Sequence, residues 1–173
     1  FEPIQDEYAL CKADLLTETV GELPEVEHLM GYYFAIEEGL PQSLALTIRD
    51  HAKPVTSDDQ LPESQRAAWI SIAERIERIV AFYSVGLPPK SDKDPYGIKR
   101  YATGLVRLCV EGSWSFDCSH TLAKALKLFP NKAGVSVSAM TTFINERLKT
   151  YALSQGVSHD VIQSVTSVDS GNI

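Results

Sequence analysis

The stretch PESQRAAWISIAERIERIVAFY, residues 62–83, decides the fold that this sequence predicts. Its apolar residues recur every three to four positions, which is typical of an α-helix with one buried face. The stripe predicted to be buried consists of Trp69, Ile72, Ala73, Ile76, Ile79, Val80 and Tyr83. Glu74 and Arg78 are four positions apart, in the order that favours an ion pair along a helix. The sequence therefore predicts a long helix from about Pro62 to Tyr83.

Helical periodicity extends over nearly the whole chain. In the first segment it links Ile4, Tyr8, Cys11, Leu15 and Val20. Proline and glycine punctuation predicts further helices from Pro24 to Gly39 and from Pro41 onward. Two polar, Pro-bearing loops are expected, the first at residues 51–64 and the second from residue 85 onward. In the second loop, Asp94 is expected to cap a helix that Pro95 opens and that runs to about Cys109. Three more helices are expected over residues 121–129, 136–155 and 158–168.

No convincing strand or internal repeat interrupts this pattern, so the predicted fold class is all-α. The sequence EGSWSFDCSH breaks the helical pattern near Gly112. We therefore expect two domains, residues 1–112 and residues 113–173, of which the second is a smaller helical segment.

The amino-acid composition limits the classes of protein to which the chain can belong. The chain has 173 residues, of which 44% are hydrophobic and 23% charged, as in ordinary globular proteins. No apolar run approaches the roughly 18 residues that span a membrane. A net charge of −7 argues against non-specific DNA coating but allows a local basic patch. Three cysteines without a CxxC pair favour a reduced, cytoplasmic compartment. The first residue is Phe1, so we expect a piece of a longer protein.

Motifs for nucleophilic or nucleotide chemistry are absent from the sequence. It has no GxSxG, no GxxxxGK[ST] and no GxGxxG. Its histidines, His28, His51, His120 and His159, have no HxxxH or HExxH spacing. We expect each of them to be an ordinary surface or interface histidine.

Asp14 is the strongest single candidate for a functional residue, because it stands among apolar neighbours on a predicted helix. Together with Glu74 and Glu77 it offers oxygen ligands for a hard cation. The plainer alternative is that Asp14 pairs with a basic residue or caps a neighbouring helix. Glu74 and Glu77 then form a solvated face with two arginines, Arg75 and Arg78.

A group of cations surrounds the second loop and the helix that follows it. Tyr96 and Tyr101 are interleaved with them, which is typical of contacts to an RNA backbone. The candidate RNA-contacting residues, which the resemblance described below assigns to tRNA binding, are Lys90, Lys93, Lys99, Arg100 and Arg107. A solvated helix end with extended lysines explains the same pattern, and the sequence leaves both alternatives open.

Two long motifs carry a resemblance to a known family. CKADLLTETVGELPEVEHLMGYYFA, residues 11–35, resembles a signature of the beta subunit of bacterial heterotetrameric glycyl-tRNA synthetase. IAERIERIVAFYSVGLPPKSDKDPYGIKRYATGLVRL, residues 72–108, is similar to a second motif of that family. A weaker third match covers residues 143–165, so the resemblance extends over nearly the whole chain. Departures include Thr19 and Leu23, which stand where the family has Met and Phe.

The resemblance implies an HD-domain-like helical bundle at residues 1–112 and a segment leading toward an anticodon-binding region. It implies an α2β2 enzyme that attaches glycine to tRNA-Gly with ATP and Mg²⁺. The catalytic core then belongs to the alpha subunit, so no catalytic residue, metal or cofactor is expected in this piece. Its expected role is tRNA placement and subunit architecture, with the alpha subunit and tRNA-Gly as partners and no DNA or membrane.

The same resemblance bears on Asp14. Active HD phosphohydrolases hold metal through a His-Asp pair, and the corresponding position here reads Ala13-Asp14, with Glu77 replacing a later family Asp. These look like degenerate HD positions on a retained scaffold. The alternative function is a metal-dependent HD-type phosphohydrolase that uses Asp14 and Glu77. A third is a helical protein-interaction module without an RNA role.

Overall fold

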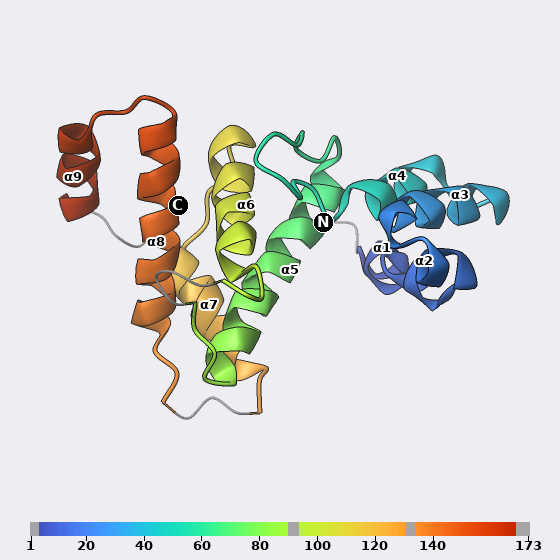
Figure 1. Cartoon of the computed structure of the whole chain (residues 1–173), viewed down its shortest axis with the longest axis horizontal. Coiled ribbons are helices and arrows are strands. Elements are labelled where there is room, and N and C mark those ends of the chain that lie inside the picture. Colours follow the sequence, from blue (N-terminus) through green and yellow to red (C-terminus); the bar gives the residue numbers. More distant parts are fainter. Residues whose placement is uncertain (1–3, 90–93, 131–133, 169–173) are drawn as a thin grey trace. The chain divides into compact units, whose positions relative to one another are not determined.

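The fold is known from a computed structural model, which describes residues 4–89, 94–130 and 134–168 (Figure 1). Within these ranges the regular secondary structure is helical and contains no β-strand, so the all-α prediction is confirmed. The chain forms two compact units, residues 1–72 and residues 73–173, which are described separately. The predicted HD-like character and the predicted domain boundary at residue 112 stay predictions.

The first unit consists of short helices that pack around a small core. In chain order they are α1 (Gln5–Leu10), the 3₁₀ helix Ala13–Leu16, α2 (Glu18–Glu22), the 3₁₀ helix Pro24–Val26, α3 (Leu29–Glu37), α4 (Gln42–Asp50) and the beginning of α5 (Gln65–Ser84). The core joins α3 to α4 through Ala35, Leu44, Ala45 and Ile48. Buried ion pairs surround it, because Glu7 binds Arg66 at 2.5 Å and Asp50 binds Arg49 and Lys53.

The prediction of one continuous helical pattern over the first twenty residues is wrong. The periodicity links Ile4 to Val20, but the chain breaks after Leu10 and turns through the 3₁₀ helix before α2 begins. Thr17 closes this turn, since its hydroxyl donates to the Asp14 carbonyl at 2.7 Å and accepts from the Val20 N–H. Asp14 lies in this 3₁₀ turn and is buried.

The second unit contains longer helices. After the remainder of α5 come α6 (Ile98–Glu111), α7 (Cys118–Lys127), α8 (Val137–Ser154) and α9 (His159–Val168). Helix α8 packs against both α6 and α7. Asp94 caps α6 as predicted, because its two carboxylate oxygens accept from the N–H groups of Ile98 and Lys99. The helix itself begins at Ile98, three residues later than the prediction at Pro95.

The long central helix is confirmed, with differences in its start and in its buried stripe. It begins at Gln65 instead of Pro62, and Trp69 and Tyr83 are only half-buried. Ile72, Ile76, Ile79 and Val80 are buried, and Arg78 pairs with Glu74 at 3.2 Å. Ala73 is exposed instead of buried, because it lies about 100° around the helix from Ile72. Arg75 is buried instead of solvated. Gly104 makes room for it, since a Cβ at that position would lie 2.9 Å from the Arg75 guanidinium carbon.

The first prediction concerns a glycine that allows a close approach. A Cβ at Gly31 would lie 2.7 Å from the Ile48 side chain and 3.2 Å from Asp14 Oδ2. We therefore expect Gly31→Ala to lower the free energy of unfolding by about 1–3 kcal/mol, as overpacking does. Urea denaturation followed by circular dichroism measures this change.

Gly21 provides the matched control, because it also lies in a helix but has no atom within 4 Å of its hypothetical Cβ. Gly21→Ala should be neutral or stabilising, by up to about 1 kcal/mol. Equal effects of the two substitutions would contradict the close approach at Gly31.

Candidate functional site

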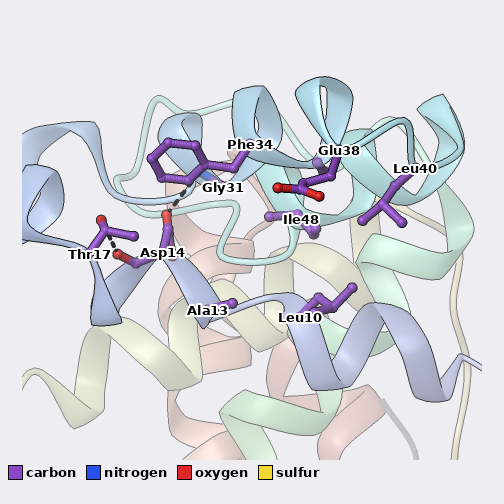
Figure 2. A pocket seen from close by; sticks show the side chains of 10 residues that line it. Leu10, Ala13, Asp14, Thr17, Gly31, Phe34, Glu38, Leu40 and Ile48 are labelled. Atoms are coloured by element: carbon purple, nitrogen blue, oxygen red, sulfur yellow. Dashed lines mark hydrogen bonds between the residues drawn. The ribbon is translucent and has the colours of Figure 1, made fainter.

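Asp14 is a buried helix cap. Its side chain is 2% exposed, and Oδ2 accepts from the backbone N–H groups of His28 at 2.6 Å and Gly31 at 3.2 Å. These groups stand at the N-terminus of α3, where a carboxylate satisfies orphan donors and complements the helix dipole (Figure 2). Of the two alternatives, the structure supports the cap.

The backbone around α3 is shaped for this contact. His28 precedes the helix with φ of +68°, a left-handed conformation that non-glycine residues adopt rarely. Its ring meets the edge of the His51 ring at a centroid distance of 4.5 Å. His51 is fully buried and its Nδ1 contacts the Ile48 carbonyl at 2.7 Å. The prediction of a surface or interface position is therefore wrong for His51.

A pocket of about 260 Å³ opens beside Asp14. Figure 2 shows Phe34, Glu38 and Leu40 along one side and Leu10 and Ala13 along the other. Asp14, Thr17, Gly31, Ala35 and Ile48 complete the lining. The pocket thus combines mostly apolar walls with two carboxylates, those of Asp14 and Glu38. Spacing in the sequence did not single out Glu38, because its relation to Asp14 arises only when α3 packs beside the 3₁₀ helix.

The metal alternative finds no support in this geometry. Among residues 4–89, 94–130 and 134–168, no three His, Cys, Asp or Glu side chains are grouped to hold a metal ion. One oxygen of Asp14 is already engaged by backbone donors. Glu77 lies on an exposed position of α5.

The candidate tRNA-binding residues fall into three groups. Lys90 and Lys93 lie outside the described residues. Lys99 and Arg100 stand in the first turn of α6, where Arg100 is exposed and Lys99 is partly exposed. Arg107 is only 9% exposed, and it binds Glu111 through Nε at 2.6 Å and Nη2 at 3.1 Å.

The Arg107 contact belongs to a polar network inside the second unit. Tyr151 of α8 donates to Glu111 at 2.9 Å, which links α8 to α6. The hydrogen bond from Arg107 is the main reason why the pKa of Glu111 is lowered, although burial opposes it. Burial also lowers the pKa of Arg75 to about 10, and the nearby guanidinium groups of Arg78 and Arg107 add to this effect.

The three cysteines lie in the interior of the protein. Cys11, Cys109 and Cys118 are free and buried. Burial raises the pKa of both the Cys109 and the Cys118 thiol to about 12, so both stay protonated at neutral pH.

Charge is divided unequally between the two units. Residues 1–72 contain fourteen Asp and Glu against four Lys and Arg, a net charge of −10. Residues 73–173 contain nine Asp and Glu against twelve Lys and Arg, a net charge of +3. The overall charge of −7 therefore conceals a net basic unit, which includes all five candidate tRNA-binding residues.

Comparison with known proteins identifies the family. The family model described as "Glycyl-tRNA synthetase beta subunit" matches residues 2–167. The chain belongs to this family. It is 36% identical over 159 residues to the "Glycine--tRNA ligase beta subunit" of Janthinobacterium sp. (strain Marseille) and 34% identical to that of Acidovorax sp. (strain JS42). Each alignment covers 92% of this chain, but only 23% and 22% of those relatives.

Membership in this family confirms the predicted resemblance and does not support the phosphohydrolase alternative. The chain spans less than a quarter of the length of the curated relatives that it matches. In the part that the structure describes, no helix is both long and apolar enough to cross a membrane.

The second prediction tests the cap. Asp14→Ala removes an acceptor from two backbone N–H groups in a buried place, so we expect the free energy of unfolding to fall by about 1–3 kcal/mol. Asp14→Asn, which keeps an oxygen acceptor, should be less destabilising. Glu25→Ala, which removes an exposed carboxylate from the same unit, serves as control and should change little. Stability equal to wild type for Asp14→Ala would contradict the cap.

The third prediction uses the pKa of Glu111. Because its folded-state pKa is lowered, its ion pair stabilises the protein above the unfolded pKa of about 4.3, and this stabilisation disappears as the pH falls through the folded pKa. The difference in unfolding free energy between wild type and Glu111→Gln should be constant above about pH 5 and shrink below about pH 4. Urea titrations across this range measure it.

Glu146→Gln is the control for this pH dependence, because Glu146 is exposed and lies 4.0 Å from Arg147. Its effect on stability should be small, because an exposed ion pair contributes little. A difference for Glu111→Gln that persists unchanged into acid would refute the assigned ion pair.

Proposed function

We propose that this chain is the part of a glycine–tRNA ligase beta subunit that helps to place the tRNA and contributes to subunit architecture. In the complete enzyme, glycine is joined to tRNA-Gly with ATP and Mg²⁺. The partners are an alpha subunit, in an α2β2 assembly with the class II catalytic core in alpha, and tRNA-Gly. The chain is inactive by itself, and the assembly is cytoplasmic.

The observation that carries the RNA role is the charge division between the two units. An RNA backbone is a polyanion, so it is repelled by the unit with net charge −10 and attracted to the unit with net charge +3. This division supports residues 73–173 as the proposed RNA-facing part of the chain. It also agrees with the family, whose relatives are named as ligases of glycine and tRNA.

Within the second unit, the start of α6 is the best candidate for backbone contact. Lys99 and Arg100 follow the segment that contains Lys90 and Lys93, and Tyr96 beside them is 51% exposed. An exposed aromatic ring next to cations offers both stacking and charge neutralisation. Arg107 contributes differently, because it is paired with Glu111 within α6, and Glu111 in turn accepts a hydrogen bond from Tyr151 of α8.

Residues 1–112 are proposed to be an HD-domain-like scaffold without hydrolase chemistry. The capping role of Asp14 supports this proposal, since the residue at the degenerate HD position is engaged in holding α3. The predicted division into residues 1–112 and 113–173 is retained as a proposal for how the family's domains map onto this chain.

The fourth prediction tests the RNA surface in the full-length beta subunit. Replacing Lys90, Lys93, Lys99 and Arg100 by Ala should weaken tRNA-Gly binding. The slope of log K against log salt should fall by roughly 0.7–0.9 for each phosphate that the variant no longer neutralises. Titration with tRNA-Gly and with an unrelated tRNA at two salt concentrations measures both effects.

Two matched variants make this test specific. Lys124→Ala with Lys127→Ala removes two cations from α7 in the same unit and should leave the salt slope nearly unchanged. Arg107→Ala should lower stability more than it lowers the slope, because Arg107 is buried and paired. An unchanged slope in the quadruple variant would reject the proposed surface.

A further inference from the structure

The pocket beside Asp14 has a feature that the capping role does not use. Oδ2 of Asp14 receives two backbone hydrogen bonds, but Oδ1 is buried without a hydrogen-bond partner among the described residues. A buried carboxylate oxygen without a donor is costly, and native structures compensate nearly all such atoms. Asp14 lines the pocket although its side chain is only 2% exposed, so a cation held in the pocket lies close to its carboxyl group.

A second carboxylate increases the negative charge at the same place. Glu38 follows the last residue of α3 and lines the pocket together with Asp14 (Figure 2). No Lys, Arg or His belongs to the described lining. The surrounding unit has a net charge of −10, which raises the local concentration of cations.

The walls of the pocket determine what kind of cation fits. Leu10, Phe34, Leu40 and Ile48 present apolar surface, which favours methylene groups over a hydration shell. A hard metal ion needs about six to eight oxygen ligands, and two carboxylates with apolar walls do not provide them. A volume of about 260 Å³ suits a ligand the size of one long side chain.

We propose that this pocket binds an aliphatic primary ammonium group on a short methylene chain. The ammonium lies at the Asp14 and Glu38 carboxylates, and the methylene chain lies against Leu10, Phe34 and Leu40. Two sources share this chemistry, namely the lysine side chain of a protein partner and a free aliphatic diamine. The inference goes beyond the tRNA role and does not depend on it.

Three probes separate the possibilities in the full-length beta subunit. They are N-acetyl-lysine methylamide, 1,4-diaminobutane and N-acetyl-norleucine methylamide, which has a similar apolar chain without the ammonium. Saturation-transfer NMR detects binding to a large protein, and calorimetry gives the dissociation constant. Because a charge-assisted contact adds about 1.4 kcal/mol or more, a cationic probe should bind about tenfold or more tighter than the norleucine probe.

Variants place the binding in this pocket. Glu38→Gln should weaken binding of the cationic probe about fivefold or more, since it removes one of two charges. Glu37→Gln is the matched control, because this exposed neighbour does not line the pocket, and should change binding less than about twofold. Ala13→Phe fills the pocket from an exposed position and should abolish binding while the melting temperature is retained.

Each outcome decides the proposal. Tight binding of the lysine probe supports a protein side chain as the natural occupant, and binding of the diamine alone supports a free amine. The proposal would be overturned if the norleucine probe bound equally well or if no probe bound at all. It would also be overturned by equal effects of Glu37→Gln and Glu38→Gln, or by undiminished binding to Ala13→Phe. Titration of the same variants with tRNA-Gly is a separate readout, so failure here leaves the proposed function standing.

Discussion

The carboxylate of Asp14, which accepts hydrogen bonds from the backbone N–H groups of His28 and Gly31, organises the first unit. This cap requires a left-handed residue at His28, a glycine at position 31 and a break in the chain after α1. Each of these features is unfavourable or unusual alone. Together they bring the Asp14 carboxylate within hydrogen-bonding distance of the two N–H groups. The pocket beside α3 is lined in part by Ala13 and Asp14 of the 3₁₀ helix that follows this break.

The same contact gives Asp14 a structural role, and the proposed function rests on other residues. Asp14, which the sequence offers as a cation ligand, caps a helix here, and no three His, Cys, Asp or Glu side chains among the described residues are grouped to hold a metal ion. The proposed RNA role rests instead on a charge division that the overall composition conceals. The first unit is acidic and the second is net basic, so the second unit is the one proposed to face a polyanion.

Periodicity was sufficient to predict the helices of the second unit, because the buried stripes of α5, α6 and α8 repeat over many residues. It failed where a contact between distant residues decided the outcome. The break near Asp14 depends on donors fourteen and seventeen positions away. The sequence places Arg75 on a solvated face and Arg107 among the cations that contact RNA or solvent, whereas Gly104 and Glu111 allow them to be buried. The pocket likewise joins residues 10–48 from four elements, which no local pattern records.

The most direct measurement of the central claim is hydrogen exchange in the full-length beta subunit with and without tRNA-Gly. Slower exchange on binding is expected in peptides that cover residues 85–111, because the start of α6 is the proposed RNA surface. Peptides that cover residues 13–38 should exchange equally with and without tRNA, since their acidic unit repels phosphate. Protection confined to residues 13–38, or none within residues 85–111 while tRNA is bound, would contradict the account.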